Sequence, residues 1–220
     1  MANALDRLID LLDLEQIEVN IFRGRSPEER VQRVFGGQVA GQALVAAGRT
    51  VPADRPVHSL HAYFIRPGDT TVPIVYLVDR VRDGRSFTTR RVSAVQHGET
   101  IFTLSASFHH PEPGPEHADP MPDVPPPETV ERNSDRLARL LDQTPRQPFD
   151  NPIDLRSVGP MSAEAAGDPS LRTTQNLIWL RVDGELPDDP LLHVCIVAYA
   201  SDLTILDTAM LPRPGHRHIQ

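Results

Sequence analysis

The sequence predicts an α+β protein in which a curved antiparallel sheet surrounds a long buried helix. Residues 35–50 are rich in alanine and glycine, and so many small residues let a helix lie close to a surface that wraps round it. Residues 57–108 then alternate polar and apolar side chains over four long segments, without another helix. A sheet of four long strands has to curve and bury one face against another element, and we expect the small-residue helix to be that element.

The elements around the start of that helix are short. Apolar spacing predicts an amphipathic helix over residues 4–13, and alternation predicts a half-buried strand over residues 15–22. Residues 24–29 are polar and indicate a loop. Gly36 and Gly37 begin the buried helix and leave backbone amides open to an oxygen ligand, such as a developing oxyanion. The alternative is that both glycines only permit tight packing.

Alternation predicts four strands, at residues 57–66, 73–81, 86–96 and 101–108. It places His58 on the same face as Leu60 and Phe64, which favours a hydrogen-bonded core histidine over a catalytic one. Five arginines could meet phosphate groups, although solvated surface charge fits each of them better: Arg66, Arg82, Arg85, Arg90 and Arg91.

A proline-rich, acidic stretch at residues 110–128 is the best domain boundary in the chain. We expect a first domain at residues 1–110, a linker at 111–135 and a second domain at 136–220. The second half predicts a helix at 129–141, strands near 153–158 and 173–182, and a long apolar helix at 190–210. Two strands are too few to cover an apolar helix, so we expect this domain to be incomplete and the chain to form a homo-oligomer.

Composition excludes several classes of function. The formal net charge of −8 argues against a nucleic-acid surface, because phosphate binding requires clustered lysine and arginine. The single cysteine, Cys195, lies on an apolar helix face and fits a small buried residue better than a nucleophile. CxxC metal spacing is absent.

We find no signal-peptide pattern and no apolar segment of membrane-spanning length, so the expected location is the cytoplasm.

The helix at residues 190–210 carries one carboxylate on its apolar side. Helical spacing predicts a buried stripe made of Leu192, Cys195, Ile196, Tyr199, Leu203 and Leu206. Asp202 projects with this stripe, and an unpaired buried carboxylate would cost several kcal/mol. Asp202 is therefore either a catalytic acid in a dry cleft or a structural residue that caps a neighbouring loop.

Several stretches together resemble the acyl-CoA thioesterase II family, in the family's order and spacing. They include FGGQ at residues 35–38, RDG and SF at residues 82–87, and AYASD at residues 198–202. The resemblance implies a double hotdog fold, with two units that each wrap a sheet around a helix. It also implies hydrolysis of fatty acyl-CoA to free fatty acid and coenzyme A, within lipid metabolism, without a metal or redox cofactor.

The resemblance also implies a catalytic role for Asp202, which matches the family's catalytic aspartate. The family combines this aspartate with a Ser or Thr and a Gln from later strands, and the sequence ends at Gln220 before such strands. We therefore expect low or no activity from these 220 residues, and a non-catalytic acyl-CoA-binding hotdog or an inactive fragment is the alternative. Weaker candidates for substrate binding are Gly37, His58 and Arg85.

Overall fold

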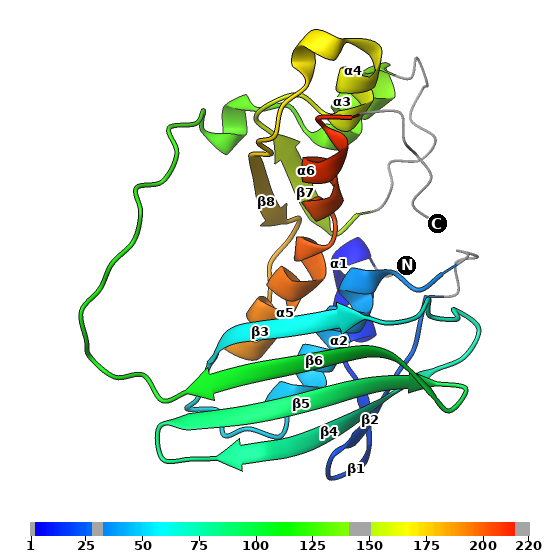
Figure 1. The fold of residues 1–220 in the computed structure, drawn as a ribbon, viewed down its shortest axis with the longest axis vertical. Helices are drawn as coiled ribbons and strands as arrows, with labels where there is room; N and C mark the ends of the chain where they lie inside the picture. Colours follow the sequence, from blue (N-terminus) through cyan, green and yellow to red (C-terminus); the bar gives the residue numbers. More distant parts are fainter. Residues whose placement is uncertain (1–2, 28–32, 141–150, 214–220) are drawn as a thin grey trace. The chain divides into compact units, whose positions relative to one another are not determined.

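The computed structural model describes residues 3–27, 33–140 and 151–213. Their contacts divide the chain into two compact units (Figure 1). We call Asp6–Pro115 together with Leu186–Ser201 the sheet unit. The hairpin unit contains the described residues of Met1–Leu5, Glu116–Glu185 and Asp202–Gln220. Each unit is described by itself.

The sheet unit is built on a six-stranded antiparallel sheet with the strand order β1-β2-β4-β5-β6-β3. The strands are β1 (Glu15–Glu18), β2 (Ile21–Gly24), β3 (Val57–Phe64), β4 (Ile74–Asp83), β5 (Phe87–Gln96) and β6 (Glu99–His109). The four predicted long strands are thus confirmed. The single strand expected over residues 15–22 is wrong, because the chain turns back at Val19 and Asn20 to form two short strands.

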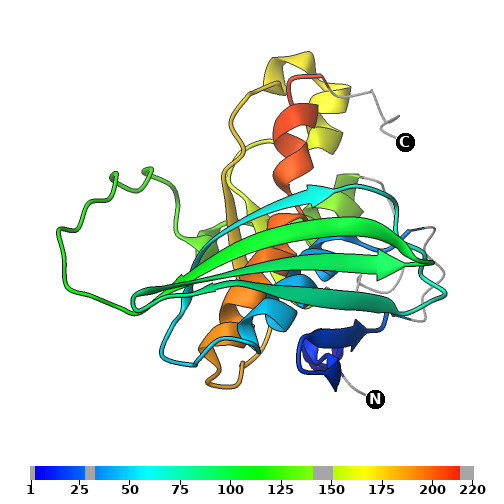
Figure 2. The same ribbon diagram turned by 60° about the horizontal axis from the view of Figure 1, so that its bottom comes forward.

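The core of the sheet unit lies between the sheet and helix α2 (Gly36–Gly48), which crosses one face of the sheet (Figure 2). Every residue of α2 after Gly36 is buried. Alternate residues of β4, β5 and β6 face this helix and are also buried, among them Tyr76, Val92, Phe102, Leu104 and Phe108. Helix α1 (Ala4–Leu12) buries Leu8 and Leu12 through its amphipathic spacing. The prediction of a small-residue helix covered by a curved sheet is confirmed.

A second helix, α5 (Pro190–Ser201), packs against α2 within the same unit. Glycines of α2 make this close approach possible. A Cβ atom on Gly37 would lie 2.2 Å from the carbonyl oxygen of Tyr199, and one on Gly41 would lie 3.2 Å from that of Cys195. A Cβ on Gly48 would lie 2.4 Å from Leu191. A side chain at any of these positions would force the two helices or their side chains apart.

The expected single helix over residues 190–210 is interrupted. Helix α5 ends at Ser201, a turn follows, and α6 (Ile205–Met210) begins after Thr204, whose φ of −135° is not helical. Ser, Asp and Thr side chains compete for backbone hydrogen bonds, and Ser201 Oγ already donates to the carbonyl of Ala198. The predicted buried stripe is correct for Cys195 and Ile196 but wrong for Leu206, which is exposed.

The helical stretch Pro190–Met210 is long and apolar enough to cross a bilayer, judged by length and composition alone. This corrects the expectation that no apolar segment reaches that length. The core helix of a soluble protein passes the same test, and α5 packs on α2. The stretch is therefore only a weak sign of a membrane span.

The hairpin unit is centred on two antiparallel strands, β7 (Ile153–Ser157) and β8 (Ile178–Val182). Short helices surround them: η1 (Pro127–Thr129), α3 (Asn133–Leu140), α4 (Ser162–Gly167), η2 (Pro169–Leu171) and α6. Residues 110–126 contain neither helix nor strand, as their proline content predicts. The contacts of helix α5 assign it to the sheet unit and not to the hairpin unit. The domain boundaries expected from the sequence stay a prediction.

Candidate functional site

Asp202 directly follows the last residue of α5 and is half-buried in the turn before α6. Three residues earlier, Tyr199 lies beside the start of α2, where its ring packs edge-on against Phe35 with centroids 5.1 Å apart. The Tyr199 carbonyl approaches Gly37 closely. The structure therefore brings the FGGQ motif against the helix that carries AYASD. Gly37 thus permits tight packing between the two helices, which was one of the two roles considered for it. Its role in substrate binding stays a prediction.

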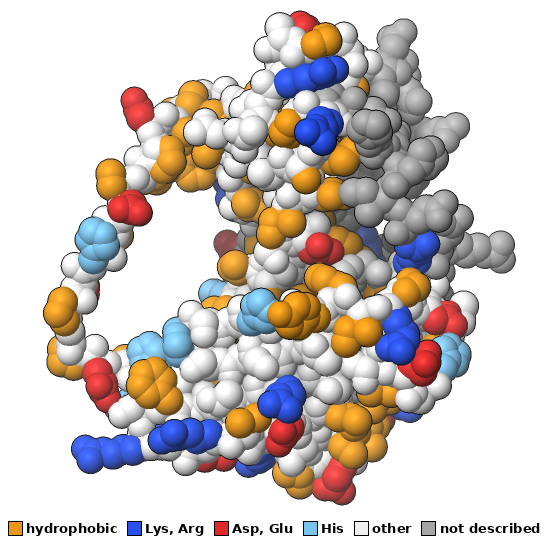
Figure 3. All heavy atoms as spheres, viewed as in Figure 1, with side chains coloured by type: hydrophobic (Ala, Val, Ile, Leu, Met, Phe, Trp, Pro, Cys, Tyr) orange, Lys and Arg blue, Asp and Glu red, His pale blue; other side chains and the backbone are white. Residues whose placement is uncertain are grey.

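His58 is exposed on the face of the sheet opposite α2, so the expectation of a core histidine is wrong. A β-bulge between Val57 and Ser59 changes the alternation at this position. The imidazole Nε2 lies 2.8 Å from Ser107 Oγ, and its ring contacts those of Phe87 and His109. Pale blue histidine side chains are visible on this exposed face (Figure 3).

Arg85 is exposed in the turn between β4 and β5, and its carbonyl accepts a hydrogen bond from Arg55. Residues after the C-terminal end of α2 hold this turn, since Arg55 also donates to the carbonyl of Gly84. Gly37 is at the other end of α2, and thirteen helical residues span about 20 Å. Arg85 and Gly37 therefore do not belong to one compact site.

One of the five arginines considered for phosphate contacts is not a surface charge. The Arg90 side chain is 1% exposed and donates to Thr50 Oγ1 and to the Thr50 carbonyl. It also forms an ion pair with Asp83 at 2.6 Å. These contacts fasten the segment after α2 to the sheet, so Arg90 has a structural role that alternation did not reveal.

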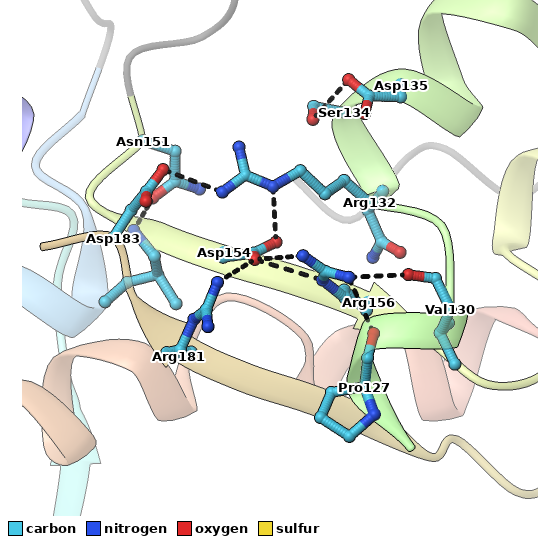
Figure 4. Close-up of polar contacts among 12 residues, drawn as sticks. Pro127, Val130, Arg132, Ser134, Asp135, Asn151, Asp154, Arg156, Arg181 and Asp183 are labelled. Carbon is cyan, nitrogen blue, oxygen red and sulfur yellow. Dashed lines mark hydrogen bonds and ion pairs between the residues drawn. The ribbon is translucent and has the colours of Figure 1, made fainter. Parts of the chain in front are cut away.

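The hairpin unit contains a cluster of charges that the sequence analysis missed. Asp154 on β7 has a side chain that is only 2% exposed, and three guanidinium groups surround it (Figure 4). Its Oδ2 accepts hydrogen bonds from Nε and Nη2 of Arg156, at 3.1 and 3.0 Å, and from Arg181 at 3.4 Å. Its Oδ1 lies 3.3 Å from Nε of Arg132 in an ion pair but accepts no hydrogen bond within the described residues.

The electrostatics of this cluster favour an ionised Asp154. Burial alone would raise the pKa of its carboxyl group, but the hydrogen bond from Arg156 and the charges of Arg132, Arg156 and Arg181 outweigh that effect. The net result is a pKa below the ordinary value. Asp154 therefore holds three arginines in place as a permanent anion at neutral pH.

A cavity of about 370 Å³ adjoins this cluster. Its wall combines Pro127 and Glu128 of η1 with the two strands, which contribute Asp154, Arg156, Trp179 and Arg181. The strand register explains why these four side chains meet, since Asp154 is paired with Arg181 and Arg156 with Trp179. The only signal in the sequence was a charged or aromatic residue at every second position, in Asp154-Leu-Arg156 and Trp179-Leu-Arg181.

Neither the cysteine nor a cluster of metal ligands supplies a catalytic group among the described residues. Burial raises the pKa of the Cys195 thiol to about 12, so it stays protonated and unreactive. Within residues 3–27, 33–140 and 151–213, no group of three or more His, Cys, Asp or Glu side chains could hold a metal ion.

A long helix against a curved antiparallel sheet defines the class of the sheet unit. Solved structures share this architecture, including a hotdog-fold protein from Alicyclobacillus acidocaldarius at 23% identity with a TM-score of 0.71. That alignment covers 94% of this chain and 72% of the other. The chain has a hotdog fold.

Sequence comparison identifies the family. The model for the acyl-CoA thioesterase N-terminal domain matches residues 25–109, and the acyl-CoA thioesterase model matches residues 156–218. The Acyl-CoA thioesterase 2 of Haemophilus influenzae is 39% identical over 96% of this chain and 75% of its own length. The crystal structure of an acyl-CoA thioesterase II, TesB2, from Mycobacterium marinum superposes with a TM-score of 0.75. The two sequences are 42% identical, and the alignment covers 96% of this chain and 72% of that one. The chain belongs to the acyl-CoA thioesterase II family.

The human Acyl-coenzyme A thioesterase 8 is 40% identical over 92% of this chain. The aligned region is 66% of the human protein, so this chain spans about two thirds of that relative.

Proposed function

We propose that this chain hydrolyses fatty acyl-CoA to a free fatty acid and coenzyme A. The observation that carries the proposal is the family match across both halves of the chain, which includes the AYASD motif at the end of α5. The relatives named above are called acyl-CoA thioesterases, and their identity extends over more than nine tenths of this chain. A second hotdog unit formed around residues 136–220 is part of the same proposal.

Asp202 is the residue proposed to hold and activate the attacking water. Its carboxylate accepts a proton from the water while the water oxygen bonds to the thioester carbonyl carbon. The carbonyl π electrons move onto the carbonyl oxygen, where hydrogen-bond donors stabilise the negative charge. When the oxyanion collapses, the carbon–sulfur bond breaks, the acid is released, and the coenzyme A thiolate takes up a proton. The half-buried turn after α5 suits such a base, because limited solvation strengthens its interactions.

The proposal is tested by measuring thiol release from a series of fatty acyl-CoA substrates with the Asp202→Asn variant. Because a general base contributes about 10²- to 10⁴-fold, we expect kcat to fall by at least 100-fold while KM changes little. Asp188→Asn is a matched control, since this exposed aspartate just before α5 undergoes the same loss of charge. Undiminished turnover in Asp202→Asn would refute the role of Asp202. Binding of acyl-CoA without turnover in the unmodified chain would select the non-catalytic alternative.

Cytoplasmic location and homo-oligomer formation are further proposals. Light scattering after size exclusion, at several protein concentrations, tests the second. A mass equal to one chain at all concentrations would contradict it.

A further inference from the structure

The cavity beside Asp154 is distinct from the turn that carries Asp202, and the proposed chemistry gives it no role. It lies within the hairpin unit, between η1 and the face of β7 and β8 that carries the charges. At about 370 Å³ it falls within the ordinary range for small-ligand sites, at its lower end. Such a cavity suits one portion of a large ligand, and its walls indicate the chemistry of that portion.

The first feature of the wall is a guanidinium group with unused donors. Arg156 is fully occupied, because Nε and Nη2 bind Asp154 while Nη1 donates to the carbonyls of Pro127 and Val130. Arg181 instead makes a single long contact, 3.4 Å from Nη2 to Asp154. Its Nε and Nη1 have no partner among the described residues, and its side chain is 67% exposed. A carboxylate anchors this arginine on one side and leaves its other donors for an anion from solvent.

The second feature is a fixed aromatic surface. Trp179 lines the cavity, and its indole Nε1 donates to the carbonyl of Pro125 at 3.0 Å. This bond holds the ring against the end of the proline-rich segment, and Pro127 of the same segment also lines the cavity. A planar base can stack on an indole in this position, as bases do in single-stranded nucleic-acid sites.

The third feature is an acceptor within the same wall. Glu128 lines the cavity and is exposed, and its carboxylate has no hydrogen-bond or ion-pair partner among the described residues. A carboxylate accepts hydrogen bonds from an exocyclic amino group but repels a phosphate. The wall thus favours a ligand with an amino-bearing planar ring near the carboxylate and a phosphate near Arg181.

We propose that this cavity binds a phosphorylated adenosine, specifically the nucleotide end of coenzyme A. The inference rests on the proposed function, since acyl-CoA is the substrate that would bring such a nucleotide to the protein. Arg181 contacts a phosphate, Trp179 stacks on the adenine, and Glu128 accepts from its amino group. Asp154 is a positioning residue, because it orients Arg181 without touching the ligand.

The test uses a reporter that lies in the cavity itself, because Trp179 is the single tryptophan of the chain. Adenosine 3′,5′-bisphosphate is titrated into the protein while tryptophan fluorescence is recorded, and coenzyme A, ADP and inorganic phosphate are titrated separately. We expect saturable quenching by adenosine 3′,5′-bisphosphate and coenzyme A, and none by inorganic phosphate at the same concentrations. No saturable change with the first two ligands would overturn the proposal. Equal or tighter binding of ADP would overturn the assignment to coenzyme A.

The variant Arg181→Gln removes the charge that is proposed to meet the phosphate. We expect its Kd for adenosine 3′,5′-bisphosphate to rise about tenfold or more. Arg172→Gln is the matched control, because this exposed arginine of the same unit lies outside the cavity, and its Kd should not change. Thermal melts of both variants show whether the fold is intact. An unchanged Kd in a folded Arg181→Gln variant would overturn the role of Arg181.

The fluorescence titration requires no turnover, so the two proposals can fail separately. Saturable quenching without thiol release would refute the hydrolase proposal and retain the nucleotide cavity. Thiol release without any response of Trp179 would retain the hydrolase and overturn the cavity.

Discussion

The sheet unit and the hairpin unit are stabilised by different kinds of buried group. In the sheet unit, apart from the buried Arg90 that pairs with Asp83, α2 and the inner face of the sheet bury mainly apolar side chains, such as Leu44 and Leu104. In the hairpin unit, the two strands are held by Asp154 and its arginines, and Arg136 pairs with Glu164 nearby. Apolar burial stabilises without direction, whereas buried ion pairs mainly impose a particular arrangement. The difference suggests that the first unit supplies stability and the second supplies a defined polar surface.

The largest expected effect is in the sheet unit. Leu44→Ala removes a side chain that is completely buried in α2, and we expect the free energy of unfolding to fall by about 3 kcal/mol. Urea denaturation followed by circular dichroism measures this change. Val197→Ala on the exposed side of α5 is the control, with an expected change of about 0.5 kcal/mol or less. Similar losses in the two variants would show that α2 is not the core of the unit.

A smaller effect is expected in the hairpin unit. Asp154→Ala leaves Arg132, Arg156 and Arg181 without their shared anion, and we expect a loss of about 2 kcal/mol at pH 7. The partial exposure of Arg132 and Arg181 keeps this value below that of a fully buried pair.

The pH dependence of this loss distinguishes charge from packing. The pKa of Asp154 is lowered in the folded state, so its ionised form stabilises the fold above the unfolded pKa, near 4. This contribution disappears as the pH falls through the folded pKa. The difference in unfolding free energy between wild type and Asp154→Ala should therefore be constant from about pH 7 to about pH 5 and shrink below about pH 4. A difference that does not change with pH would mean that packing, not charge, stabilises the hairpin.

The smallest effects test how closely α5 packs on α2. Gly37→Ala places a methyl group against the Tyr199 carbonyl, and the backbone cannot move aside cheaply. Crowding and the better helix propensity of alanine partly cancel, so we expect a net loss of about 1 kcal/mol. Gly48→Ala meets only the flexible side chain of Leu191 and should be nearly neutral. Thermal melts of the two variants compare them directly, and a larger shift for Gly48→Ala would contradict this account.

Regular patterns in the sequence predict the sheet unit well. Period-two alternation identifies the four long strands, because burial on one face leaves a repeating pattern in the sequence. Small residues identify α2, which is buried on all sides. The same reasoning fails where a local event interrupts the repeat. The bulge before Ser59 turns His58 outward, and the turn after Ser201 separates α5 from α6 although apolar spacing continues past it.

The charged cavity could not be predicted in the same way. Asp154 and Arg181 lie on strands separated by α4 and η2, and no short turn between the strands fixes their register. Without that register, alternate charged residues resemble two solvated strand faces. Spacing and motif singled out Asp202 but placed it inside a continuous helix, whereas the structure places it in the turn after α5.

The packing of α5 on α2 has a consequence for synthesis on the ribosome. Helix α2 and all six strands of its sheet are translated before residue 110, but α5 is made only near residue 200. Until then, the glycine surface of α2 and the apolar side chains around it lack their cover. The unit whose synthesis begins first is therefore completed only after residues 116–185 of the hairpin unit have been translated, and its nascent form is open to aggregation or chaperone binding during that interval.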